Sequence, residues 1–430
     1  MLYDCLIIGG GIAGLTCGIR CASEGLKTAI ISGGMNSLHF SSGSIDVAGY
    51  DAKKNIVKKP FEHIGKVISE QKNHPYAAVG ISNIKKSIGF FTNELEKESL
   101  ILNSNEDLNH FHITALGTLK PTYLSQESIF NEKAVTILKN RSKIAILNFK
   151  GFRDYYPEQT AALLKKQSLF KNMEIISGEI SLPYYMNTEK NLHEFRSIDL
   201  ARIFETEKYL PRIAEQIVKA SEDAEAVSMP AFLGIKNYTF IRKRLEELTG
   251  KYIYEIPSLP PSIPGLRLDN ALKNRYIRLG GDYISGDKAE SGEYKGNTLE
   301  KIITRGSGSS GIGADFFVLA TGSFFTGGLA SEFNNIFEPV LGLKVKNGKS
   351  INNWYNDSFF DKKSHPFLEY GVETNKKLNP KNSEGKTVKN LFCAGSVLAG
   401  YNPVNEGNGA GVAISTGFSC AETIIKELKK

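Results

Sequence analysis

Three glycines near the N-terminus give the first chemical signal in this sequence. Gly9, Gly11 and Gly14 have the spacing G-x-G-x-x-G and directly follow the apolar residues 4–8. In a nucleotide-binding turn, the first glycine allows the tight turn, the second lets the backbone approach a pyrophosphate, and the third lets the next helix pack on the strand. The helix N-terminus offers unpaired N–H groups to the phosphates. Because a helical pattern and a second apolar strand pattern follow, the segment predicts a dinucleotide-type fold.

The second predicted strand lacks the acidic residue that usually ends it. Residues 28–31 lead into Ser32, whereas an aspartate or glutamate usually accepts hydrogen bonds from the adenosine ribose at this point. A serine hydroxyl can make one hydrogen bond there but cannot chelate two ribose hydroxyls. The substitution disfavours NAD most, and it leaves FAD and FMN as alternatives.

Two strand–glycine segments and a terminal helix near the C-terminus complete the expected cofactor site. An apolar strand from 315 runs into an A-T-G turn, another at 390–393 ends in glycine, and a glycine cluster precedes a helical pattern at 413–428. The candidate cofactor residues in these segments are Thr321, Gly322, Gly395, Ser396, Gly409 and Gly411. In this order, the segments resemble the two-dinucleotide-binding-domain flavoprotein superfamily. The resemblance implies that the last helix points its N-terminus at the flavin pyrimidine ring. It also implies that Ser396 stands where an acidic residue is often found.

A loop rich in small hydroxyl residues follows the second predicted strand. Ser41 and Ser42 precede Gly43, and this composition suits a loop that lies against a flavin ring and its phosphates. His39 in the same loop allows two interpretations. It is either a covalent attachment site for flavin, as at a comparable place in succinate dehydrogenase-like proteins, or a histidine that packs or hydrogen-bonds within the loop. We favour the second interpretation.

Two loops in the middle of the chain have residues that suit an anionic substrate. Lys120 lies between the hydroxyls of Thr118 and Thr122, and Arg153 follows a predicted strand. Lysine and arginine beside hydroxyl or N–H groups bind phosphate, although ordinary surface charge explains each loop equally well. Nearer the C-terminus, the His365 imidazole could act as a general base toward a hydroxyl whose carbon gives hydride to flavin. A packed loop histidine is the alternative.

These candidate sites need more than one domain to position them. The chain has 430 residues, which exceeds the usual size of a single compact core. The glycine-turn pattern is lost from about residue 50 and returns after a proline cluster at 257–264. We therefore predict an α/β fold of the Rossmann type, with a flavin-binding domain made of residues 1–50 and 262–430. The inserted residues 51–261 would form an α+β domain that caps the flavin and binds substrate.

Composition disfavours several other classes of protein. Hydrophobic residues make up 41% and charged residues 23%, the balance of a globular protein rather than of a disordered chain. No apolar stretch approaches the roughly 20 residues that span a bilayer, and no basic leader indicates a signal peptide, so we expect a cytoplasmic location. The net charge of +7 is spread without a basic block, so we expect no nucleic-acid partner. The five cysteines form no C-x-x-C pair, so we expect no metal site.

Nearly the full length of the chain resembles the B subunits of anaerobic glycerol-3-phosphate dehydrogenases. The resemblance rests on the glycine-rich turn and on more specific segments at residues 39–44, 117–122, 151–154, 259–262, 364–367 and 390–411. It implies a flavoprotein that oxidises sn-glycerol 3-phosphate to dihydroxyacetone phosphate and passes electrons to a quinone. It also implies FMN as the cofactor, whereas the pyrophosphate-binding turn favours FAD, so both flavins stay open.

The same resemblance implies two partner subunits. They are a larger flavoprotein subunit and a membrane-associated iron–sulfur subunit, through which this chain would lie at the inner face of the membrane. Two other functions fit the sequence: a stand-alone fumarate-reductase-like flavin oxidoreductase acting on a small acid, and a scaffold or electron-transfer subunit without catalysis. A flavin-dependent tRNA-modifying enzyme is a third alternative, which only the net charge favours.

Overall fold

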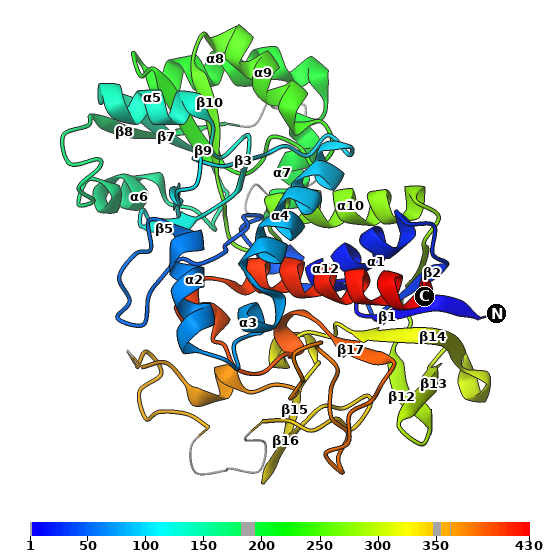
Figure 1. Ribbon diagram of the computed structural model, residues 1–430. Coiled ribbons are helices and arrows are strands. Elements are labelled where there is room, and N and C mark those ends of the chain that lie inside the picture. The colour runs from blue at the N-terminus through cyan, green and yellow to red at the C-terminus, as the bar shows by residue number, and fades with distance from the viewer. Residues whose placement is uncertain (1, 182–193, 347–353, 362) are drawn as a thin grey trace. The chain divides into compact units, whose positions relative to one another are not determined.

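The chain folds into two compact units. The computed structural model, drawn in Figure 1, describes residues 2–181, 194–346, 354–361 and 363–430. The first unit is made of three segments of the chain, Met1–Ser37, Ile45–Ser99 and Asp269–Lys430. The second is made of two segments, Leu38–Ser44 and Leu100–Leu268.

A seven-stranded sheet forms the centre of the first unit. Its strand order is β11-β2-β1-β14-β13-β12, and β17 also pairs with β14. The strands β11, β2, β1, β14 and β17 run parallel, whereas β13 pairs antiparallel with both β12 and β14. The strands are β1 Tyr3–Ile8, β2 Thr28–Ser32, β11 Asp282–Ser285, β12 Ala289–Lys295, β13 Thr298–Thr304, β14 Ile312–Leu319 and β17 Leu391–Cys393. A separate hairpin contains β15 Ala330–Glu332 and β16 Asn335–Phe337.

Two helices pack closely beside this sheet. Helix α1 contacts β1, β2 and α12, and α12 also contacts β17, α3 and α4 (Figure 1). The crossing of α1 and α12 needs glycine, because a Cβ atom at Gly417 would collide with the backbone of Ala13. The helices of this unit are α1 Ile12–Ala22, α2 Pro60–Glu70, α3 Pro75–Val79, α4 Ile81–Glu96, α11 Pro403–Glu406 and α12 Gly409–Leu428.

The second unit contains a four-stranded parallel sheet of order β10-β9-β7-β8. All residues of β7, β9 and β10 are buried, which fits a parallel sheet covered on both faces. Its strands are β7 Ile144–Phe149, β8 Ile175–Ile180, β9 Ala226–Pro230 and β10 Tyr252–Ile256. Two further antiparallel pairs lie outside this sheet. One joins β3 Leu102–Asn103 to β6 Ser125–Gln126, and the other joins β4 His110–Ile113 to β5 Leu119–Thr122. Its helices are α5 Glu132–Asn140, α6 Pro157–Leu164, α7 Ser197–Phe204, α8 Leu210–Ser221 and α9 Tyr238–Thr249. Helix α10, Ile263–Arg278, runs across the chain boundary between the two units.

The observed units differ from the predicted domains of 1–50 plus 262–430 and 51–261. Residues 51–99 belong to the first unit, because α3 and α4 pack on α12. The loop Leu38–Ser44 belongs instead to the second unit, where the backbone at Leu38 approaches Gly265 too closely for a Cβ atom. Both differences arise from packing between segments that are distant in sequence.

Most predicted helices and strands are present with shifted ends. Residues 197–221 form two helices, α7 and α8, because Pro211 fits the first turn of a helix but not its interior. The terminal helix begins at Gly409, four residues before its predicted start. Within the part of the chain that the structure describes, no helix is long and apolar enough to cross a bilayer.

Candidate functional site

The predicted nucleotide turn lies between β1 and α1. Gly9 has φ +119°, and a Cβ atom there would collide with the carbonyl of Ala320. A Cβ atom at Gly14 would collide with the carbonyl oxygen of Gly9, so the helix packs against the turn itself. Gly11 differs, because a Cβ atom there would meet no atom of the described residues within 4 Å. The two outer glycines are therefore required by the fold, whereas Gly11 borders open space.

The open space at Gly11 fits a bound phosphate. Gly11 is the N-cap of α1, and no side chain of the described residues caps the helix there. The first N–H groups of α1 therefore keep their capacity to donate hydrogen bonds, and the helix dipole favours an anion beside them. A flavin with a pyrophosphate would be held at this point by backbone groups alone.

The carboxyl ends of β1, β14 and β17 lie side by side. Ile8 pairs with Leu319, and Leu319 pairs with Cys393. This register brings the predicted cofactor residues that follow β14 and β17 to the same sheet edge as the nucleotide turn, namely Thr321, Gly322, Gly395 and Ser396. A Cβ atom at Gly322 would lie 3.6 Å from the Ser396 hydroxyl. Among the described residues, the buried Thr321 hydroxyl has no hydrogen-bond partner, which marks it as a group able to bind a ligand.

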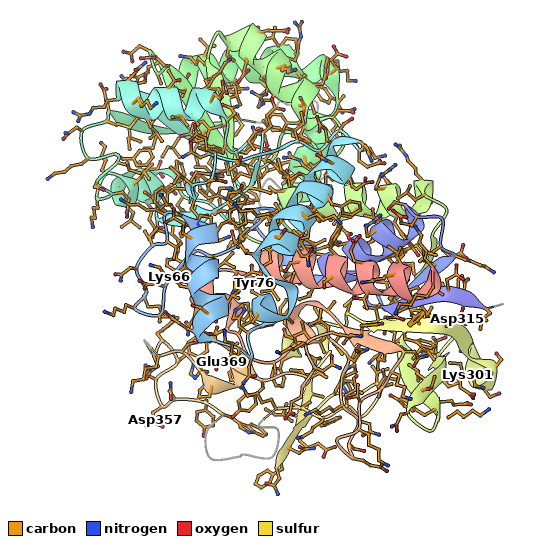
Figure 2. The ribbon with its side chains drawn as sticks, in the orientation of Figure 1. Lys66, Tyr76, Lys301, Asp315, Asp357 and Glu369 are labelled. Atoms are coloured by element: carbon orange, nitrogen blue, oxygen red, sulfur yellow. The ribbon has the colours of Figure 1, made fainter. Side chains whose placement is uncertain are left out.

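Helix α12 begins beside this edge without a side-chain cap from the described residues. Its first residue is Gly409, and Gly411 donates its N–H to the Asp46 carbonyl oxygen at 2.9 Å. A Cβ atom at Gly411 would collide with the hydroxyl of Tyr76, a residue labelled in Figure 2. That hydroxyl donates to the Val47 carbonyl oxygen at 2.7 Å. Gly411 is thus needed for packing, and the first turn would supply its other N–H groups, not that of Gly411, to a flavin ring.

The end of β2 has partners that the sequence did not predict. The Ser32 hydroxyl donates a hydrogen bond to the Gly34 carbonyl oxygen in the loop that follows β2. The side-chain amide of Asn36 donates both to the Gly10 carbonyl oxygen and to the buried Asp269 carboxylate, each at 2.8 Å. The Asn36 side chain therefore connects the Asp269 carboxylate to the glycine turn. No local motif could have identified it, because it comes from a helix about 260 residues further along the chain.

The loop Leu38–Ser44 is closely packed within the second unit. Gly43 has φ +69°, and a Cβ atom there would collide with Pro264. The carbonyl oxygen of His39 accepts a hydrogen bond from Ser262 N at 2.9 Å. The Ser41 hydroxyl donates to the Leu38 carbonyl oxygen, so it stabilises the loop. The structure thus gives His39 a hydrogen-bonded place in the loop, and covalent flavin attachment there stays untested.

Lys120 lies against this loop inside the second unit. Its Nζ donates to the hydroxyl of Ser44 at 3.1 Å and to that of Ser42 at 3.3 Å. The two hydroxyls are themselves 2.7 Å apart. A half-buried ammonium beside two hydroxyls has the donors that bind a phosphate or carboxylate.

Two buried histidines beside Lys120 were not predicted. His110 and His112 lie on one face of β4 and share the Ser125 hydroxyl, His110 Nε2 at 2.5 Å and His112 Nε2 at a shorter distance. Burial lowers the pKa of His112 well below its ordinary value, and the charges of Lys120 and His110 lower it further. His112 is therefore neutral at pH 7. The H-x-H spacing on a strand was the available signal, since residues two apart share a face.

Arg153 and His365 have different surroundings from Lys120. Arg153 is exposed in the turn after β7, and the ion pairs of the described residues do not include it. His365 Nδ1 accepts from Asn356 N at 3.1 Å, and its Nε2 lies 3.0 Å from the Phe359 carbonyl oxygen. Both ring nitrogens are thus engaged within their own loop. These contacts favour a structural role, and a catalytic role for His365 stays a prediction.

The five cysteines are all buried as free thiols. Cys5, Cys17 and Cys21 bring their sulfur atoms within 4.8 Å of one another between β1 and α1. The other two, Cys393 and Cys420, lie in the same core. Small buried thiols pack as hydrophobic groups, and the predicted absence of a metal stays a prediction.

Comparisons with known proteins find a family model and named relatives that match most of this chain. The family model for the FAD binding domain matches residues 4–412. A protein named as the B subunit of anaerobic glycerol-3-phosphate dehydrogenase from Aliivibrio fischeri (strain MJ11) is 37% identical, over 100% of this chain and 96% of that protein. A protein of the same name from Vibrio cholerae is 35% identical, over 99% of this chain and 97% of its own length. The solved 3-ketosteroid Δ1-dehydrogenase from Sterolibacterium denitrificans has a TM-score of 0.45 at 11% identity, covering 99% of this chain and 100% of that chain.

The fold and the family model define a flavoprotein with an FAD-binding α/β domain. The similarity to the curated relatives extends over their full length, including the second unit. The chain belongs to the family of anaerobic glycerol-3-phosphate dehydrogenase B subunits.

Proposed function

We propose that this chain is the flavin-carrying member of a complex that oxidises sn-glycerol 3-phosphate to dihydroxyacetone phosphate. The observation that supports it most is the full-length similarity to relatives named for this activity. The uncapped helix at Gly11 and the buried Thr321 hydroxyl support a bound flavin independently of those names. We propose FAD rather than FMN, because the open space at Gly11 suits a pyrophosphate.

The reaction removes a hydride from carbon 2 of the substrate and a proton from its hydroxyl group. Bound flavin supplies the two-electron acceptor. The first unit would hold it through the N–H groups of α1 and α12 and the loops after β14 and β17. Within the second unit, Lys120 would bind the substrate phosphate together with the hydroxyls of Ser42 and Ser44.

The neutral state of His112 strengthens this assignment. Since His112 stays unprotonated at pH 7, it adds no second positive charge beside Lys120. The Lys120 ammonium therefore has the hydroxyls of Ser42 and Ser44 beside it, and no charged imidazole from His112. The exposed Arg153 lacks such a cluster of hydroxyl donors among the described residues, so we assign phosphate binding to Lys120.

The proposed partners are a larger flavoprotein subunit and a membrane-associated iron–sulfur subunit. Electrons would pass through them to a quinone, and the chain would lie at the inner face of the membrane through its partner. The relatives are named as one lettered subunit of a dehydrogenase, and this name supports a multi-subunit complex.

Two measurements test the proposal. The first is the mass of the flavin released when the purified chain is denatured, which should be that of FAD. The second is the reduction of a dye acceptor by sn-glycerol 3-phosphate, measured on the complex assembled with and without this chain. A flavin-free chain that leaves the rate unchanged would instead support a scaffold function.

A further inference from the structure

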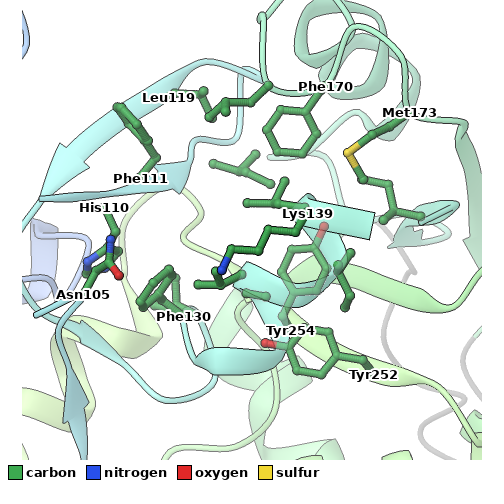
Figure 3. Close-up of a pocket in the computed structure, with 18 of the residues that line it drawn as sticks. Asn105, His110, Phe111, Leu119, Phe130, Lys139, Phe170, Met173, Tyr252 and Tyr254 are labelled. Carbon is green, nitrogen blue, oxygen red and sulfur yellow. The ribbon is translucent and has the colours of Figure 1, made fainter. Parts of the chain in front are cut away.

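A cavity of about 340 Å³ lies wholly within the second unit, and the proposed reaction does not use it (Figure 3). Helix α5, the hairpin of β4 and β5, and β10 contribute to its walls. The walls are mainly aromatic and aliphatic, and include Phe111, Phe130, Phe170, Met173, Tyr252 and Tyr254. Small-molecule sites are typically apolar cavities of about 300–1,000 Å³ with a few polar groups.

Apolar side chains of helix α5 form one wall of this cavity. They include Val135, Ile137 and Leu138, and no residue of α5 is fully buried. Protein interiors are normally packed as densely as organic crystals, so side chains that border a cavity of this size lack packing partners. A ligand with an apolar body would provide those partners.

One positive charge at the cavity has no counter-ion among the described residues. Figure 3 shows the Lys139 side chain extending among the lining rings, with its amine toward Phe130. Lys139 is an exposed residue that takes part in no ion pair within the described part of the chain, so water solvates its ammonium until a ligand binds. The acidic lining residue, Glu255, is already neutralised by Arg267 through buried contacts of 2.6 and 2.9 Å. The ligand that complements these walls is therefore apolar in its body and negative at one end.

We propose that this cavity binds an amphipathic monoanion, a molecule with an aromatic or aliphatic body and a single carboxylate or sulfonate group. The body lies between α5 and the aromatic side chains, and the anionic group lies at Lys139. This ligand differs from a polyol phosphate, which has no apolar body to fill the cavity. The site is thus separate in its chemistry from the cluster at Lys120.

Fluorescence titration tests the charge requirement. The probe is 8-anilinonaphthalene-1-sulfonate, and its uncharged analogue N-phenyl-1-naphthylamine is the comparison. We expect one-to-one binding of the anionic probe, and Lys139→Gln should raise its dissociation constant about 3- to 10-fold. The same substitution should leave the affinity for the uncharged analogue unchanged. The control is Lys219→Gln, on the exposed face of α8, which should affect neither probe.

Filling the cavity tests its location. Val135→Trp should abolish binding of both probes, whereas Thr136→Trp, on the exposed side of the same helix, should not. Circular dichroism checks that each variant is folded, and Ala134→Phe replaces Val135→Trp if that variant is unfolded. Equal binding by the filled variant and the Thr136→Trp control would overturn the proposal. If Lys139→Gln weakened the binding of both probes equally, Lys139 would not be the group that binds the anion.

Discussion

At the scale of single residues, the three glycines of the nucleotide turn differ in what they can tolerate. Gly9 and Gly14 have backbone atoms where a Cβ would lie, so substitution there would disturb the fold. Gly11 has open space and φ −86°, a conformation that any residue adopts. A side chain at Gly11 would therefore compete with the flavin rather than with the protein.

We accordingly predict that Gly11→Val loses flavin but keeps its fold. The valine methyl groups would occupy the space in which the phosphates approach the backbone. Absorbance of the purified variant near 450 nm measures flavin content, and its thermal midpoint measures folding. Gly89→Val is a matched control, because it also lies in open space with an ordinary φ. Normal flavin content in Gly11→Val would contradict the assigned binding site.

Lys120 and Arg153 looked equivalent in the sequence, but the structure separates them. We predict that Lys120→Ala raises the Michaelis constant for sn-glycerol 3-phosphate about 10- to 100-fold, because a charge-assisted contact contributes roughly 1.5–3 kcal/mol. The turnover number should change less if the contact is equally strong in ground and transition states.

The exposed Arg153 provides the control for this measurement. Arg153→Ala in the assembled complex should leave the Michaelis constant within about twofold, since surface charges of this kind contribute little. If neither substitution altered the Michaelis constant, the phosphate would have to bind elsewhere, and the scaffold hypothesis would gain support.

At the scale of elements, the hairpin of β4 and β5 gives stability a pH dependence. The pKa of His112 lies well below its unfolded value, mainly because the side chain is buried. As the pH falls below about 6.5, the unfolded chain binds a proton that the folded chain does not. The free energy of unfolding should then fall by up to about 1.4 kcal/mol per pH unit from this group alone.

Urea unfolding at pH 5.5 and pH 7.5 measures this effect. We predict that His112→Gln, which has no titrating ring, loses less stability between the two pH values than the unmodified chain does. Above pH 7 the two stability profiles should run parallel. An identical slope in both proteins at low pH would mean that His112 is protonated in the folded state.

Local motifs could be predicted from the sequence, whereas contacts between distant segments could not. The glycine turn and the strands around it were predictable, because G-x-G-x-x-G requires a local strand–turn–helix. Lys120 was identified as an anion-binding candidate, but its contacts with Ser42 and Ser44 depend on how distant segments pack. Asp269 was missed for the same reason, since only tertiary structure brings it to the glycine turn. The observed units differ from the predicted domains at residues 51–99, whose helices pack on a helix near the C-terminus.

At the scale of the whole molecule, we predict that the chain works only in a complex. The isolated chain should reduce a quinone analogue with sn-glycerol 3-phosphate at less than about one-tenth of the rate of the assembled complex. The reason is that the family similarity supports one member of a larger assembly. Comparable rates for the isolated chain and the complex would favour the stand-alone oxidoreductase instead. Steady-state assays with matched flavin content make the comparison direct.

The strand order of the first unit also has a consequence for biosynthesis. β1 pairs with β14, so Tyr3 lies opposite Ala314, and β14 in turn needs β17 at residues 391–393. A ribosome must therefore make nearly the whole chain before this sheet can close, and the apolar edge of β1 stays unpaired during that time. The sheet of the second unit lies within residues 144–256 and can form earlier. Because long-range pairing is slow and exposed strand edges aggregate, newly made chains should depend on chaperones chiefly for the sheet that contains the nucleotide turn.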